Sequence, residues 1–354
     1  MLRRLVSTTT HRSPSSTALV GARLCRRSSS TKSGPAAFRP VLKILKYSAL
    51  TGITLTVASF GAFEYGHQRI EYDKLRLSAD EEVKKYQWDI SGELWQGDPA
   101  GGTDSGLGRA GRQAVRSAWH VLNETDGTMG LPEGAEGSGF TDGEAREYFA
   151  LQFLKTAISF AEAYREQCHP LTLPTLHFRM ASIFESMGDR FNPQTRYHLE
   201  AAWKGFAGAD LNAARIALKL GDINARLQQP DEACKWWTKA IQLCGNTFTP
   251  TTDPSSLVPN RVPTQPWAQR IIASTLVSVS AHYAQTQRFA DAEKFEVSAL
   301  SFLRSIPAPD SISCASAPQT LHFLFLLQRS SLLSVHLAEV LSAQKKPAQS
   351  SIQH

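Results

Sequence analysis

The sequence predicts an all-α protein built from an array of helix pairs, and two stretches carry this prediction. In residues 212–245, the apolar residues Ile216, Leu220 and Ile223 recur at helical spacing, and a second helix begins at Pro230. Proline suits the first turn of a helix, and the two acids behind it suit the positive end of the helix dipole. Residues 274–304 repeat this arrangement.

Four residues of the first stretch predict how its two helices pack. Gly221, Ala233 and Ala240 are small enough to let the helices approach closely, and Trp237 fills the space between them. On a 34-residue grid these are the positions that tetratricopeptide repeats use, so the stretch resembles that family. Because one such repeat cannot bury its own apolar face, it predicts neighbours.

Weaker copies occur on both sides of that repeat. Residues 173–203 form a degenerate copy, and residues 150–158 carry a further second-helix pattern. In the copy at 274–304, Glu296 stands where an aromatic residue is expected. The resemblance implies a tetratricopeptide-repeat-like α-solenoid, which we expect to follow a single N-terminal transmembrane helix.

The net charge of +6 for the 354 residues comes from the N-terminus. Residues 1–46 contain ten Lys and Arg and no acid, which leaves 28 of the 38 basic residues against all 32 acidic ones, a net charge of −4. Since nucleic-acid binding needs a positive surface, this balance argues against a nucleic-acid partner.

Residues 1–34 have the composition of a mitochondrial transit peptide. They are rich in Arg, Ser and Thr and contain no acid. The alternative is a disordered basic tail.

Residues 41–63 are predicted to cross a membrane once. The 17 residues from Tyr47 to Phe63 carry no charge and would span about 25 Å as a helix, which snorkelling of Lys43 and Lys46 extends to roughly 30 Å. The positive flank should stay in the matrix, which places the C-terminal domain in the intermembrane space of mitochondria. The alternative is a buried helix of a soluble protein.

The remaining chain divides into three predicted parts. Residues 64–141 form a juxtamembrane helix and a glycine-rich linker, 142–343 the repeat domain, and 344–354 a disordered tail. Within the linker, Arg109–Leu122 is amphipathic and could provide the first helix of the opening repeat. The last apolar segment resembles the first helix of a further repeat, which either a partner covers or a truncated C-terminus leaves incomplete.

Motifs for chemistry are weak. Gly106, Gly108 and Gly111 match G-x-G-x-x-G, but no apolar strand precedes them, so we expect no dinucleotide. Cys234 and Cys244 lie about 15 Å apart on one helix and cannot bridge each other; we expect packing cysteines. The histidines show no metal-ligand spacing. The sequence predicts a protein that is not an enzyme and has no cofactor and no metal.

The repeat resemblance implies a groove lined by the first helices, which binds extended peptides or partner helices. The Lys and Asn that hold chaperone tails in other family members are replaced here by Leu218 and Asp222, so broader recognition is expected. The residues predicted to face the groove are Arg215, Leu218, Asp222, Arg226, Val277, Ala281 and Gln285.

The order of the parts resembles the fungal tetratricopeptide adaptor of the mitochondrial i-AAA protease, over roughly residues 40–340. That resemblance implies a non-enzymatic adaptor of the inner membrane, inserted by one helix, which recruits unfolded or misfolded substrates to a membrane-bound AAA protease. The alternative is an assembly or scaffold factor for a respiratory or import complex.

Overall fold

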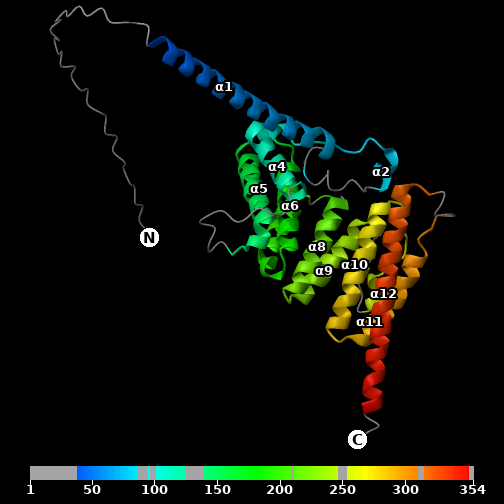
Figure 1. Cartoon of the computed structure of the whole chain (residues 1–354). Helices are drawn as coiled ribbons and strands as arrows, with labels where there is room; N and C mark the ends of the chain where they lie inside the picture. The colour runs from blue at the N-terminus through cyan, green and yellow to red at the C-terminus, as the bar shows by residue number, and fades with distance from the viewer. Residues whose placement is uncertain are drawn as a thin grey trace, which may run out of the picture. The chain divides into compact units, whose positions relative to one another are not determined.

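The structure is a computed structural model that describes residues 38–86, 95, 101–124, 139–206, 208, 211–245, 253–309 and 315–350. All regular structure within these ranges is helical, as the sequence predicts (Figure 1). The chain divides into two compact units, one ending at Phe60 and one beginning at Gly61. The predicted transit peptide, residues 1–34, lies outside the described residues.

Helix α1, Phe38–Arg69, contains the predicted transmembrane segment. The hydroxyls of Thr51, Thr54 and Thr56 each donate to the backbone carbonyl four residues earlier, at 2.8–2.9 Å. By length and composition, one of the described helices is long and apolar enough to cross a membrane, and it is not α1. That helix is Ala317–Gln344, near the C-terminus. Three threonines, two serines and two glycines between residues 47 and 63 explain the lower hydropathy of α1.

The second unit contains a series of helix pairs. In each pair, two consecutive helices pack against each other. The pairs are α4 (Gly108–Asn123) with α5 (Ala145–Ala163), α6 (Thr172–Ser186) with α7 (Asn192–Gly205), α8 (Leu211–Arg226) with α9 (Pro230–Leu243), and α10 (Pro266–Gln285) with α11 (Phe289–Arg304). Successive pairs touch through α5 on α6, α7 on α8, and α8 and α9 on α10. The last helix, α12 (Ala317–Ser350), packs on α10 and α11.

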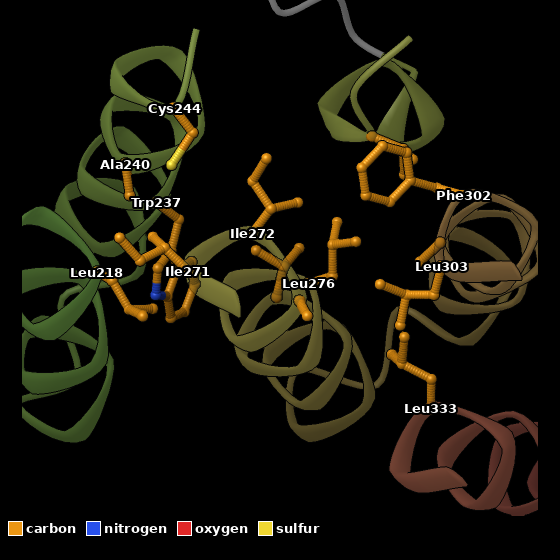
Figure 2. Packing of buried hydrophobic residues seen from close by; sticks show 14 of the residues in the cluster. Leu218, Trp237, Ala240, Cys244, Ile271, Ile272, Leu276, Phe302, Leu303 and Leu333 are labelled. Carbon is orange, nitrogen blue, oxygen red and sulfur yellow. The ribbon is translucent and has the colours of Figure 1, made fainter. Parts of the chain in front are cut away.

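One cluster of buried hydrophobic residues runs through the helices of the C-terminal half (Figure 2), and further clusters lie among α4 to α8. In the close-up, Leu218 and Trp237 face Ile271 of α10 on one side, and Leu303 and Leu333 lie on the other. Ala233 and Ala240 are fully buried and Trp237 is 2% exposed, which confirms the predicted packing of the α8–α9 pair. The helix α10 therefore joins the α8–α9 pair to the last two helices through a continuous apolar contact.

The glycine-rich segment is an integral part of the packed unit. Helix α4 packs on α5, so the predicted boundary at residue 142 does not separate two compact bodies. Gly106 lies so close to the backbone of Gln167 that a Cβ would be 2.2 Å from its carbonyl oxygen. The buried Asp104 carboxylate accepts the backbone N–H groups of Gly106 (2.8 Å) and His169 (2.7 Å). The glycine here permits a close backbone approach rather than a phosphate cradle.

The end of the chain and the segment that follows α1 differ from the predicted boundaries. Helix α12 continues to Ser350, past the predicted limit of 343. After α1, a π-helical turn (Ile70–Lys74) and an irregular stretch lead to α2, Glu81–Tyr86. The side chain of Leu75 in that stretch is completely buried. The helix predicted within residues 64–141 is therefore interrupted between Lys74 and Glu81.

Candidate functional site

A groove of about 890 Å³ lies between α8 and α10 and reaches the connection between α6 and α7. Two helix-pair connections contribute to its rim, since Gln228 and Thr286 both line it. The residues that line it are Asp189, Asn192, Asp222, Ala225, Arg226, Leu227, Gln228, Pro230, Trp237, Ser278, Ala281, His282, Gln285 and Thr286.

Asp222 lies at the inner wall of this groove. Its carboxylate accepts a hydrogen bond from the indole Nε1 of Trp237 at 3.0 Å. Burial raises the pKa of Asp222, against the opposing effects of hydrogen bonds from Ser278 and Trp237. The Trp237 ring lies 5.4 Å from the ring of His282, centroid to centroid. Asp222 is thus held in place by the core residue that also fills the α8–α9 pair.

Further polar side chains line the groove, some buried and some exposed. Asn192 is only 4% exposed, and its Oδ1 has no hydrogen-bond partner among the described residues, while its Nδ2 donates to Asp189 at 3.4 Å. Gln285 and Arg226 are exposed, and Arg226 reaches Glu185 at 3.6 Å. The groove thus contains both an acceptor and donors, which are the groups that pair with the N–H and C=O groups of a peptide backbone.

The structure brings four of the predicted groove residues together at this groove: Asp222, Arg226, Ala281 and Gln285. Val277 is half-buried and packs against the apolar core. The prediction for Leu218 is wrong, because its side chain is 9% exposed and belongs to the core. Leu218 is buried because α10 packs directly on α8, which turns that side of α8 into an interface.

Arg215 does not line this groove. Its charge acts on two arginines that the sequence analysis did not single out, Arg179 and Arg270. Its guanidinium carbon is 5.2 Å from the centroid of the Phe178 ring. Burial is the larger cause that lowers the pKa of Arg179 and of Arg270, and the positive charge of Arg215 lowers both further. Arg179, Arg215 and Arg270 come from α6, α8 and α10, the first helices of three successive pairs. The sequence feature that could have indicated this set is the presence of an arginine on the first helix of each of these pairs.

A second cavity, of about 620 Å³, lies beside α5, α6 and α7 and is lined in part by Cys168, His169 and His177. The Nδ1 atoms of His177 and His198 are 2.9 Å apart, so one ring must donate and the other accept. The pKa of His198 is lowered to about 4, mainly by burial and to a smaller extent by the neighbouring His177. Within the described residues, no group of three or more His, Cys, Asp or Glu side chains is arranged to hold a metal ion. Cys168, Cys234 and Cys244 are free thiols.

Comparison of the chain with known protein families, with characterised proteins and with solved structures finds no match. The site is therefore interpreted from its own geometry.

Proposed function

We propose that this protein is a membrane-anchored, non-enzymatic adaptor that binds unfolded or misfolded polypeptide segments and presents them to the mitochondrial i-AAA protease. In this proposal the helix pairs form a tetratricopeptide-repeat-like solenoid. The observation that carries the proposal is the groove between α8 and α10, whose lining is rich in polar side chains and includes both hydrogen-bond donors and acceptors.

The groove has the size and chemistry of a peptide site. Its volume of about 890 Å³ is within the range of ligand sites in proteins. A peptide N–H group could donate a hydrogen bond to the Oδ1 of Asn192, which has no partner among the described residues. A peptide carbonyl could accept hydrogen bonds from Gln285 or Arg226. Backbone recognition tolerates many sequences, as an adaptor for unfolded chains requires.

The composition of the N-terminus and the first helix supports the proposed location. An acid-free basic segment precedes α1, which fits a transit peptide of the mitochondrion. In α1, the threonine hydroxyls are satisfied within the helix by backbone carbonyls, which lowers the cost of placing them in hydrocarbon. We propose a single-pass inner-membrane protein whose larger unit faces the intermembrane space.

The first experiment is a purification of the full chain from mitochondrial membranes in mild detergent, with identification of the proteins that co-purify. The proposal expects a membrane AAA protease at comparable stoichiometry. Recovery of respiratory or translocase subunits without a protease would contradict it.

Binding by the groove is tested on the same purified protein with a permanently unfolded polypeptide, reduced and carboxymethylated lactalbumin, as the probe. The exposed pair Arg226→Ala and Gln285→Ala should weaken its affinity about tenfold, which corresponds to ~1.4 kcal/mol. Arg304→Ala, at an exposed position on α11, is the matched control and should change nothing. Equal affinity of both variants would remove the groove from the mechanism.

One observation favours the alternative of a scaffold for a folded inner-membrane complex. Helix α12 is buried on one side only, and its other side exposes Leu321, Leu324, Leu327 and Val335, each 47–53% accessible. An apolar stripe of this kind suits a fixed partner helix. Salt-resistant, stoichiometric association with one folded protein, abolished by Leu324→Glu, would favour the scaffold.

A further inference from the structure

A third cavity, of about 350 Å³, is lined by the C-terminal end of α1 and by residues of α4 and α5. Its walls are mainly apolar, and two of the residues that form them, Ile70 and Val121, are buried. Arg69, His120 and Glu124 also line it and are exposed, so they mark its opening. An apolar interior behind a charged opening suits an amphiphile, which is a molecule with a hydrocarbon chain and a polar head.

His67 adds a buried polar atom to this cavity. The residue lines the cavity and is only 6% exposed, and its Nδ1 has no hydrogen-bond partner among the described residues. Burial, and then the charge of Arg116, lowers the pKa of His67, so the ring is neutral at neutral pH. A neutral imidazole nitrogen either donates or accepts, and a carbonyl or hydroxyl of a bound molecule would satisfy it. Because a buried polar atom without a partner is unfavourable, this nitrogen favours a ligand with a polar group where its head joins its chain.

Exposed tyrosines flank the uncharged stretch of α1. Tyr47 is 64% exposed before it, and Tyr65 and Tyr72 are 73% and 60% exposed after it. Tyrosine is enriched at both membrane–water interfaces, because its ring suits the hydrocarbon boundary and its hydroxyl suits water. Tyr47 and Tyr65 are 18 residues apart, which is about 27 Å along a helix and close to the ~30 Å of a hydrocarbon core. This spacing supports a membrane surface near Tyr65, beside the residues of α1 that line the cavity.

The charges at the opening distinguish between amphiphiles. His120 and Glu124 pair at 2.8 Å, and Arg69 lies 3.8 Å from Asp73. Both signs of charge are therefore present, which matches a head that carries a phosphate and an ammonium group. A free fatty acid would instead place a bare carboxylate at the opening, where Glu124 would repel it.

We propose that this cavity binds one zwitterionic phospholipid of the surrounding membrane. An acyl chain lies between α1, α4 and α5, the ester groups of the glycerol lie at His67, and the head lies at Arg69, His120 and Glu124. The bound lipid thereby joins the end of α1 to α4. This inference rests on the proposed membrane insertion of α1, and it adds a lipid ligand to the proposed function.

Gly66 offers a way to fill the cavity without a clash. It lines the cavity, and a Cβ built on it would meet nothing within 4 Å. In Gly66→Leu the new side chain would occupy the space of the acyl chain. Gly61→Leu is the matched control, because Gly61 also belongs to α1 and has open space around an added Cβ, but does not line the cavity.

The experiment uses the full chain in phosphatidylcholine nanodiscs that contain some phosphatidylcholine with a diazirine in one acyl chain. After illumination, the wild-type protein should be labelled within residues 47–60, which the bulk bilayer contacts, and also at α4 and Phe153. Gly66→Leu should reduce the labelling of α4 and Phe153 at least fivefold and leave that of residues 47–60 unchanged. Gly61→Leu should match the wild type at α4 and Phe153.

The wild-type measurement does not depend on the folding of either variant. Labelling of residues 47–60 without labelling of α4 or Phe153 would overturn the lipid site and leave the membrane insertion standing. Equal labelling of α4 in the wild type and in Gly66→Leu would also overturn it. If residues 47–60 are not labelled either, the proposed insertion of α1 fails, and the lipid site fails with it.

A second probe tests the class of lipid. A free fatty acid that carries a diazirine in its chain is added to the same nanodiscs in place of the labelled phospholipid. It should label α4 and Phe153 several-fold less than the phospholipid does at the same concentration. Stronger labelling by the fatty acid would overturn the assignment to a phospholipid. Neither probe involves a protease or an unfolded polypeptide, so the lipid site and the peptide groove fail separately.

Discussion

The Trp237 ring lies directly against the backbone of Gly221. A Cβ built on Gly221 would be 2.4 Å from both Cδ1 and Nε1 of that ring. The same Nε1 donates to Asp222, the next residue along α8. One indole therefore fixes how closely α8 and α9 approach and orients the carboxylate at the wall of the groove.

Gly221→Ala should destabilise the protein. The added methyl would force the buried ring to move, at a typical cost of about 1–3 kcal/mol, against a gain in helix propensity of about 1 kcal/mol. A net loss of up to ~2 kcal/mol should appear as a lower thermal unfolding temperature. Gly66→Ala is the matched control, because no atom lies within 4 Å of its added Cβ and that variant should be neutral or slightly stabilised. Equal melting temperatures for the two variants would contradict the tight contact.

Glu296 is a buried acid whose replacement should stabilise the protein at neutral pH. It is 0% exposed, its Oε1 accepts from the Ser280 hydroxyl at 2.6 Å, and its Oε2 has no partner among the described residues. The Ser280 hydroxyl also lies 2.9 Å from His336 Nδ1. Burial raises the pKa of Glu296, and the charges of Glu293 and Glu339 add to this.

The sign of the pH effect follows from that shift. Above pH 4.5 the unfolded chain releases this proton before the folded protein does, so the free energy of unfolding falls as pH rises towards the raised pKa. Glu296→Gln keeps the acceptor for Ser280 and removes the titration. Its melting temperature should exceed that of the wild type at pH 7.5 and converge with it near pH 4. Glu166→Gln, at an exposed position, should show no such pH-dependent difference, and a uniform offset for Glu296→Gln would refute the assignment.

Glu71 should anchor the turn that follows α1 to α4. Its carboxylate accepts from the backbone N–H of Thr103 at 2.7 Å and from the Thr103 hydroxyl at 2.6 Å, and it lies 3.6 Å from the Nε of the buried Arg116. Glu71→Ala would leave Arg116 buried without this partner. The loss of one partner of a buried charge pair typically costs about 3–5 kcal/mol.

That loss should be local and measurable. Hydrogen exchange and proteolysis near residues 70–75 and 101–104 should accelerate in Glu71→Ala. The control is Glu64→Ala, which removes an ion pair with the exposed Arg109 and should have little effect. Similar protection in both variants would show that Glu71 is not the anchor.

Helix positions and the pairing of neighbouring helices could be predicted from the sequence, because both depend on short-range patterns. The segment predicted as Arg109–Leu122 is α4, and Pro230 begins α9 as expected. The groove was only partly predictable. Asp222 and Gln285 line it, but Leu218 is buried, since the side of α8 that faces α10 depends on the angle between the pairs. Periodicity within one helix carries no information about that angle.

The sequence by itself determined that this chain is helical, that its helices pair with their neighbours, and that Gly221, Ala233, Ala240 and Trp237 form one tight pair. These features follow from residue size and spacing within about thirty residues. Only the tertiary structure decided that Tyr86 meets Arg270, 184 residues away, and that Trp95 covers Arg179. Such contacts join residues that lie far apart along the chain. They depend on how the helix pairs stack and on where the segment after α1 packs, and no local sequence pattern encodes either.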